Sequence, residues 1–267
     1  MSVQQSEPFT VESDGLLLHG SITRADRGDG RARPGIVLCH EFPDQPIASE
    51  RWERSWRSLA ERIADEAGWH VLVMGLRGVG RSEGNFSLRG WQRDIVASAT
   101  TLAQDPGVGT VWLCGSGTGG ALAIAAAADE PLIRGVAALA APASFVRWRA
   151  STSTLISQAR ARNVIRDPAF PADPGRWARE LVEIRPIDVV GKLAPRPLFL
   201  CHGVDDDLIP VDDSRLLAEA AGGNVELHQL NWAGRRIRHD PRAVALLLGW
   251  LDRVAIRFGT MTPITGL

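Results

Sequence analysis

The fold is decided by residues 110–128, which read TVWLCGSGTGGALAIAAAA. The apolar run Thr110–Cys114 is typical of a strand that is buried on both faces, and the small residues of Gly119–Ala128 are typical of a closely packed helix. The glycines between them allow a tight turn. No lysine follows them, so the turn lacks the residue with which a Walker-type loop binds phosphate. We therefore interpret this stretch as a strand, a tight turn and a helix.

The same alternation of strands and helices continues on both sides of this stretch. The predicted strands are Gly35–Cys39, His70–Met74, Val136–Ala140, Leu198–Cys201 and Val225–Leu230, after an opening hairpin of Phe9–Glu12 and Leu16–Thr23. The predicted helices are Trp52–Ile63, Trp91–Leu102, Ser214–Ala221 and Pro241–Val254. The alternation predicts an α/β fold with a mostly parallel central sheet and helices on both faces.

One segment interrupts this alternation. Residues 145–193 contain Pro168, Pro171, Pro174 and Pro186, with a possible helix near Ser153–Arg162. We interpret 145–193 as a small helical cap inserted over one end of the sheet, within a core formed by 1–144 and 194–267.

Composition narrows the classes of partner. The chain has 267 residues, a net charge of −1 and scattered arginines, which fits one globular domain and argues against a nucleic-acid partner. No secretion signal or membrane-spanning run is apparent, so we expect a cytoplasmic protein without a membrane partner. Cys39, Cys114 and Cys201 lie in apolar runs and are expected to be reduced buried thiols. No spacing indicates a metal site, and we expect no cofactor.

Five motifs lie at predicted strand ends, where parallel sheets place their ligands. They are His40-Glu41-Phe42-Pro43, the loop 77–84, the turn 115–120, the segment 202–210 that begins His202-Gly203, and Ala233-Gly234-Arg235. In this order they resemble the α/β-hydrolase fold superfamily over essentially the whole chain. The resemblance implies an α/β-hydrolase fold with a Gly-x-Ser-x-Gly nucleophile turn.

The chain departs from that pattern at the residues that carry hydrolysis. In the implied register the nucleophile position is Gly117, while Ser116 and Thr118 are each one residue out of place. The resemblance implies Asp206 as the triad acid and places Arg235 at the position of the triad histidine. Arginine cannot accept a proton, so the proton relay is missing. We expect Arg235 and Asp206 to form a buried ion pair. His239, further along, is expected to be a surface residue at the start of the last helix.

Glu41 is a third departure. It replaces a glycine that often follows the histidine in the family, and its carboxylate would oppose a developing oxyanion. The N–H group of Phe42 remains able to polarise a carbonyl. Alternatively, Glu41 points outward and pairs with an arginine.

A pocket without a triad leaves three functions open. The pattern of losses resembles non-hydrolytic members such as the bottromycin-pathway peptide epimerase, which favours proton transfer on a peptidic or largely apolar molecule in specialised metabolism, with Glu41 and Asp206 as candidate catalytic residues. The alternatives are a pseudo-hydrolase that only binds a small-molecule or modified-peptide ligand, and a residual esterase that uses Ser116 or Cys114. The expected ligand-binding residues are Phe42, Gly117, Thr118, Val146, Trp148, Ile209, Trp232 and Arg235.

Overall fold

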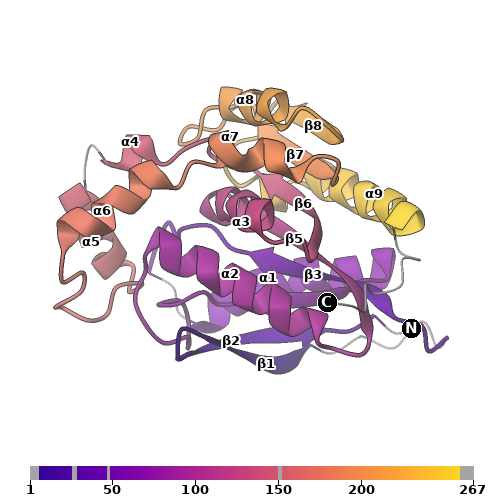
Figure 1. The fold of residues 1–267 in the computed structure, drawn as a ribbon, viewed down its shortest axis with the longest axis horizontal. Helices are drawn as coiled ribbons and strands as arrows, with labels where there is room; N and C mark the ends of the chain where they lie inside the picture. Colours follow the sequence, from indigo (N-terminus) through magenta and orange to yellow (C-terminus); the bar gives the residue numbers. More distant parts are fainter. Residues whose placement is uncertain (1–5, 26–28, 47–48, 150–151, 259–267) are drawn as a thin grey trace.

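The structure, a computed structural model, describes residues 6–25, 29–46, 49–149 and 152–258 (Figure 1). It contains one eight-stranded sheet with the strand order β1-β2-β4-β3-β5-β6-β7-β8. The strands are β1 (Glu7–Ser13), β2 (Leu16–Thr23), β3 (Arg33–Cys39), β4 (His70–Met74), β5 (Val108–Ser116), β6 (Ile133–Leu139), β7 (Leu198–Gly203) and β8 (Val225–Leu230). β1 and β2 are antiparallel, β2 is antiparallel to β4, and all other neighbours are parallel. The prediction of a mostly parallel sheet is therefore confirmed.

Helices cover both faces of the sheet (Figure 1). On one face α2 contacts α3, which contacts α7, and α7 contacts α8; on the other face α1 and α9 both contact η1. Their bounds are α1 (Ser49–Arg62), η1 (Ile63–Ala67), α2 (Leu88–Ala103), α3 (Thr118–Asp129), α7 (Pro186–Val189), α8 (Asp212–Ala221) and α9 (Pro241–Phe258). Trp52, at which we predicted the first helix to begin, has its side chain outside the described part of the structure.

The predicted insertion contributes α4 (Val146–Arg149), α5 (Thr152–Ala161) and α6 (Pro174–Glu183), which lie together at one end of the molecule (Figure 1). The last part of the same segment behaves differently. There α7 contacts α3, and η2 (Val190–Leu193) contacts α3 and α8. Its side chains Val190 and Leu193 are buried in the main core. The bounds 145–193 for a separate cap remain a prediction.

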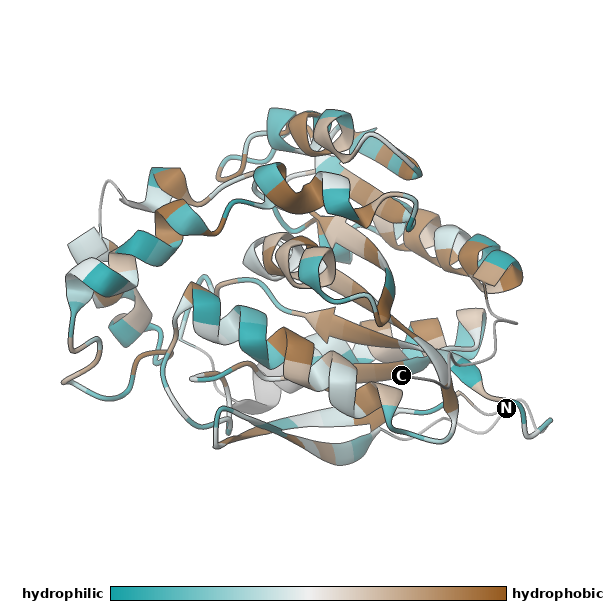
Figure 2. Ribbon diagram, in the orientation of Figure 1, coloured by the Kyte–Doolittle hydropathy of each residue, from teal (hydrophilic) through white to brown (hydrophobic). Residues whose placement is uncertain are grey.

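Central strands are buried on both faces, and hydrophobic residues concentrate there, while the outer helix surfaces are hydrophilic (Figure 2). Several tryptophans pack in this core. Trp112 makes edge-to-face contacts with Trp69 and Trp250 at ring-centroid distances of 5.5 and 5.8 Å. Burial of such rings is a main source of folding stability. Among the described residues, no helix has the length and apolarity needed to cross a membrane.

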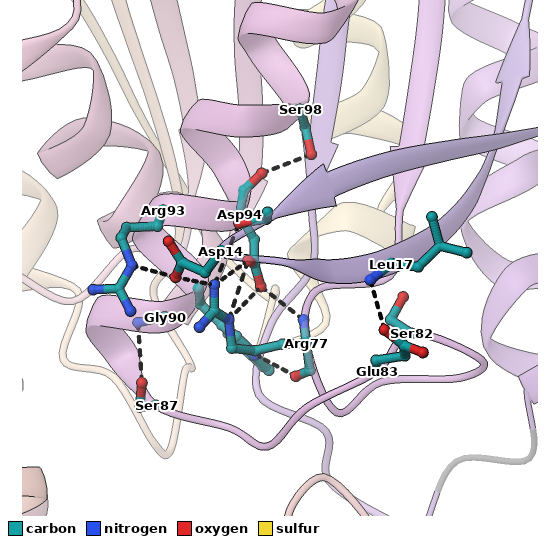
Figure 3. Close-up of polar contacts among 12 residues, drawn as sticks. Asp14, Leu17, Arg77, Ser82, Glu83, Ser87, Gly90, Arg93, Asp94 and Ser98 are labelled. Carbon is teal, nitrogen blue, oxygen red and sulfur yellow. Dashed lines mark hydrogen bonds and ion pairs between the residues drawn. The ribbon is translucent and has the colours of Figure 1, made fainter.

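A buried ion pair fixes the loop that follows β4 (Figure 3). The guanidinium Nη2 of Arg77 lies 2.6 Å from Oδ1 of Asp94, a fully buried residue of α2. Asp94 also accepts the backbone N–H of Arg77 at 2.8 Å. Asp14, from the β1–β2 turn, bridges Arg77 and Arg93 with one carboxylate oxygen. The network joins the first hairpin, the loop after β4 and α2.

Asp94→Asn is expected to lower the free energy of unfolding by about 3 kcal/mol, because it leaves the buried Arg77 guanidinium with a single, partly exposed counter-charge. Urea denaturation measures this difference. The matched control is Glu183→Gln, which removes the carboxylate of an exposed ion pair with Arg89 and is expected to cost below about 1 kcal/mol. Equal losses in the two variants would contradict the structural importance of the buried pair.

Candidate functional site

A cavity of about 790 Å³ opens at the carboxyl ends of the central strands. One wall is the loop after β3, the floor is the turn between β5 and α3, and the other walls come from α4, α5 and the loops before α8 and α9. It is lined by Glu41, Phe42, Pro43, Asp44, Gln45, Pro46, Ser55, Ser116, Gly117, Thr118, Ala140, Arg147, Trp148, Thr154, Leu155, Gln158, Arg162, Leu208, Ile209, Arg235, Arg236, Arg238 and His239.

Gly117 forms the apex of the turn on the cavity floor, with φ 52° and ψ −121°. This left-handed φ is strained for a residue with a side chain. The flanking glycines allow close packing, since a Cβ on Gly119 would lie 2.2 Å from the carbonyl oxygen of Cys39. At Gly117 itself an added Cβ would meet only Glu41, at 3.2 Å from its Cβ. A side chain at the apex would therefore extend into the cavity beside Glu41.

Ser116 and Thr118 flank the apex and line the cavity, although both residues are buried. Within the described residues, neither hydroxyl makes a hydrogen bond to a basic side chain. The backbone N–H groups of Phe42 and Thr118 also form no turn or loop hydrogen bond in the described part. Thr118 begins α3, where N–H groups have no partner within the helix and the helix dipole is positive. The floor therefore offers free donors to an oxygen, without a base-activated hydroxyl.

Glu41 is held in the cavity wall by Arg238. Its Oε1 lies 3.2 Å from Nη2 of Arg238, and its Oε2 is buried without a hydrogen-bond partner in the described structure. Arg238 is itself largely buried, with its guanidinium 4.4 Å from the ring centroid of Trp56. Of the two alternatives from sequence, Glu41 does pair with an arginine, but it lines the cavity rather than pointing outward.

His40 precedes Glu41 and is a buried neutral histidine. Its Nε2 accepts the backbone N–H of Leu76 at 3.1 Å, and its Nδ1 lies 2.9 Å from the carbonyl oxygen of Glu41, to which it donates. Burial lowers the pKa of His40 to about 4. The neutral imidazole thus joins the backbone at Glu41 to that at Leu76. A protonated Nε2 could no longer accept the hydrogen bond from Leu76.

We expect His40 to make stability depend on pH. Its pKa is about 4 when folded and 6.5 when unfolded, so the stabilisation is complete above 6.5 and is lost as pH falls towards 4. The loss amounts to about 3 kcal/mol. Urea denaturation from pH 7 to pH 4 measures it. His40→Gln should remove this part of the slope and leave the part due to carboxylates; an unchanged slope would contradict the assignment.

Asp206 lies outside the cavity lining and is held by its own loop. Its Oδ1 accepts the N–H groups of Leu208 and Ile209, both at 2.9 Å, and its Oδ2 lies 3.5 Å from Nε2 of the buried His202. Burial raises the pKa of Asp206, but the contact with His202 and the two N–H groups outweigh it and hold that pKa below its usual value. Asp206 therefore anchors the loop that presents Ile209 to the cavity.

The expected ion pair between Arg235 and Asp206 is wrong. Arg235 instead lies 3.3 Å from a carboxylate oxygen of Asp44, and its side chain is 40% exposed. The physical reason is that Asp206 already has two N–H donors and a histidine, while a partly hydrated guanidinium costs less than a buried one. His239 is exposed, as expected, but it also lines the cavity. Its pKa is lowered by burial and by Arg238, with Glu41 opposing.

Two residues that we expected in the cavity lie elsewhere. Val146 is exposed at the start of α4, and Trp232 is 90% exposed with a positive φ of 62°, so its ring points to solvent. The other six expected ligand-binding residues line the cavity: Phe42, Gly117, Thr118, Trp148, Ile209 and Arg235. Cys114 is fully buried, and burial raises its pKa to about 12, which leaves an unreactive thiol.

Sequence reasoning missed four arginines of the cavity: Arg147, Arg162, Arg236 and Arg238. The run Arg235-Arg236-Ile237-Arg238-His239 was a visible signal, because a basic cluster directly follows a motif at a strand end. The arginines near α4 and α5 carried no comparable signal, since nothing in the sequence fixed how the inserted helices face the core. Among the described residues, no group of three or more His, Cys, Asp or Glu could hold a metal ion.

Comparisons with known proteins agree with this architecture. The family described as serine aminopeptidase, S33, matches residues 50–172. Est1E from Butyrivibrio proteoclasticus is 19% identical with a TM-score of 0.70, over 94% of this chain and 98% of that one. DcsB, solved in complex with its substrate analogue, is 15% identical with a TM-score of 0.72 over 93% and 99% of the two chains. The α/β hydrolase GrgF from Penicillium sp. sh18 is 19% identical, with a TM-score of 0.71 over 93% and 98%. No curated protein matches the sequence.

Proposed function

The chain has the α/β-hydrolase fold, and we propose that it is a non-hydrolytic enzyme of that fold, which transfers a proton next to a carbonyl group of an apolar or peptidic small molecule of specialised metabolism. The observation that carries the proposal is the position of Glu41. Its side chain lies directly beside Gly117, the apex of the floor turn, which has no side chain of its own. A carboxylate there can act as a base but not as part of a serine relay.

The backbone at Gly117 supports the assignment of this residue to the nucleophile position. Its φ and ψ give the sharp strand-to-helix turn that exposes a nucleophile in this fold. Glycine has no atom that can be acylated, and Arg235 at the place of the base cannot accept a proton. Two of the three parts of a triad relay are therefore lacking.

The remaining groups are sufficient for an isomerisation. The substrate carbonyl oxygen would accept hydrogen bonds from the backbone N–H groups of Phe42 and Thr118, which would stabilise negative charge on that oxygen. Glu41 would then take the proton from the adjacent carbon, and the C–H electron pair would form an enolate. Return of a proton from water to the opposite face of the same carbon gives the epimer and restores the carbonyl, and Glu41 releases its proton to the solvent. No nucleophile and no net redox change are required.

Asp206 has a supporting part in this scheme. It keeps the loop that carries Leu208 and Ile209 in place through two N–H hydrogen bonds, and so shapes one cavity wall. We assign it a positioning role, because it does not line the cavity and its carboxylate contacts His202 and the N–H groups of its own loop.

The test is exchange of a substrate α-proton with solvent deuterium. The protein is incubated in D2O with a panel of apolar acyl thioesters and C-terminally modified dipeptides, and the loss of each α-proton signal is followed by NMR. We expect exchange in at least one compound without release of a free acid. Exchange in none of them, or hydrolysis in its place, would contradict the proposal.

A residual esterase is the second candidate, and one observation favours it: Ser116 lines the cavity, and the similar structures include esterases. Against it stands the absence, in the described structure, of a hydrogen bond from Ser116 to any base. A fluorophosphonate that labels the natural protein, and fails to label Ser116→Ala, would establish this candidate and exclude ours.

A further inference from the structure

Cationic side chains outnumber carboxylates in the cavity. Five arginines line it, namely Arg147, Arg162, Arg235, Arg236 and Arg238, against the two carboxylates of Glu41 and Asp44. Arg238 pairs with Glu41, and Arg235 pairs with Asp44. The other three arginines form no ion pair within the described part of the chain. The cavity lining therefore carries a net positive charge, which comes from Arg147, Arg162 and Arg236.

Arg162 shows this most clearly. Its guanidinium lies 5.4 Å from the ring centroid of Phe42, at the side of the cavity. Its Nε is buried and donates to no acceptor in the described structure. A buried donor without an acceptor costs about 1–3 kcal/mol, so such groups are usually satisfied by a partner. The cavity is the space from which that partner can come.

The three arginines stand on different elements and line the same cavity. Arg147 lies in α4 and Arg162 directly follows α5, whereas Arg236 belongs to the loop before α9. Arg147 and Arg236 are exposed and Arg162 is half-buried, which places them towards the mouth. The lining also has an apolar part, formed by the half-buried Trp148 and the buried Leu155 and Ile209.

We propose that the ligand is an amphiphilic anion: an apolar body seated on Trp148, Leu155 and Ile209, with a carboxylate or phosphate ester bound at the mouth by Arg147, Arg162 and Arg236. Arginine presents paired N–H donors that match the oxygens of both anions. The inference rests on the proposed function in that it names the substrate class of the same cavity, with the reacting carbonyl at the floor near Gly117 and the anionic group at the mouth.

The test uses three probes that share one apolar body: 4-phenylbutyrate, 4-phenylbutyl phosphate and the neutral 4-phenylbutyramide. Binding to the full chain is measured by calorimetry at low and at high salt. We expect the two anions to bind about tenfold or more tightly than the amide, as charge-assisted hydrogen bonds imply. Salt should weaken only the anions. The ratio of carboxylate to phosphate affinity identifies which anion the site prefers.

Substitutions then locate the effect. Arg162→Gln, and separately Arg147→Gln with Arg236→Gln, should weaken both anions about tenfold and leave the amide unchanged. The matched control is Arg215→Gln on α8, an exposed arginine outside the cavity, which should change nothing. Equal binding of the three probes, no binding of the anions, or anion binding that survives all three arginine substitutions would overturn the proposal.

The outcome is separable from that of the proposed function. Selective anion binding without deuterium exchange in any substrate would support this inference and contradict proton transfer. Exchange of the α-proton of a neutral substrate, together with equal binding of the anionic and neutral probes, would support proton transfer and contradict this inference.

Discussion

Glu41→Gln is expected to lower the rate of α-proton exchange by about 10²–10⁴-fold, the contribution typical of a positioned general base. The substitution keeps the size and shape of the side chain, and its amide oxygen can still accept from Arg238, which now lies 3.2 Å from the carboxylate. The substitution removes the negative charge of Glu41 and with it the ability to accept a proton, and the stability lost with the Arg238 ion pair is followed separately as a change in Tm. The loss of the α-proton signal in D2O gives the rate for each variant.

Two controls separate chemistry from folding. Glu219→Gln, an exposed carboxylate on α8, should exchange at the natural rate. Glu41→Asp keeps the base but draws it back by one methylene, and should recover part of the rate. If Glu41→Gln exchanged as fast as the natural protein, Glu41 would not be the base, and a purely ligand-binding cavity would become the better description.

Gly117→Ser combined with Arg235→His is expected to convert the natural protein, which a serine-directed fluorophosphonate should leave unlabelled, into one that it labels. The new hydroxyl would stand at the apex, above the free N–H groups of the floor, with an imidazole available from the loop before α9. Its Cβ would meet Glu41 at 3.2 Å, so Glu41 must shift by a few tenths of an ångström. The left-handed φ adds strain of about 1–2 kcal/mol, visible as a lower Tm.

A third substitution strengthens this experiment. Glu41→Gly in the double variant removes both the contact at 3.2 Å and the carboxylate that opposes an oxyanion, so labelling should become faster. Gly117→Ser alone should label slowly, because Arg235 cannot take up the proton. Labelling of the natural protein, or equal labelling of single and triple variants, would show that position 117 is not the nucleophile position.

Local patterns predicted the strands and the floor turn well. The run 110–128 predicted the turn at Gly117, because close approach of backbone leaves glycine as the only residue that fits at 115 and 119. Short, continuous apolar runs predicted β3 to β7, because such runs are typical of strands buried on both faces of a sheet.

Ion pairing was not predictable in the same way. Arg235 and Arg238 lie three residues apart, yet one pairs with Asp44 and the other with Glu41, far away in sequence. A long side chain reaches carboxylates from several elements, so the choice depends on tertiary placement and on which carboxylates are already satisfied. The cationic mouth was missed for this reason, since it forms only when α4, α5 and the loop before α9 come together.

The pair of Glu41 and Arg238 also constrains how this site can change by mutation. The two residues are 197 positions apart, and each depends on the other: Arg238 is largely buried on Trp56, and Glu41 already has one unpaired oxygen. Loss of Glu41 leaves the largely buried Arg238 guanidinium without its counter-charge, at a cost of about 3 kcal/mol, whereas loss of Arg238 leaves Glu41 with 35% of its side chain exposed to water and costs less. The effects of substituting Glu41 and Arg238 are thus expected to be non-additive. Variants that lack only one of the two residues, and so stand between this site and that of a triad hydrolase, are expected to be less stable.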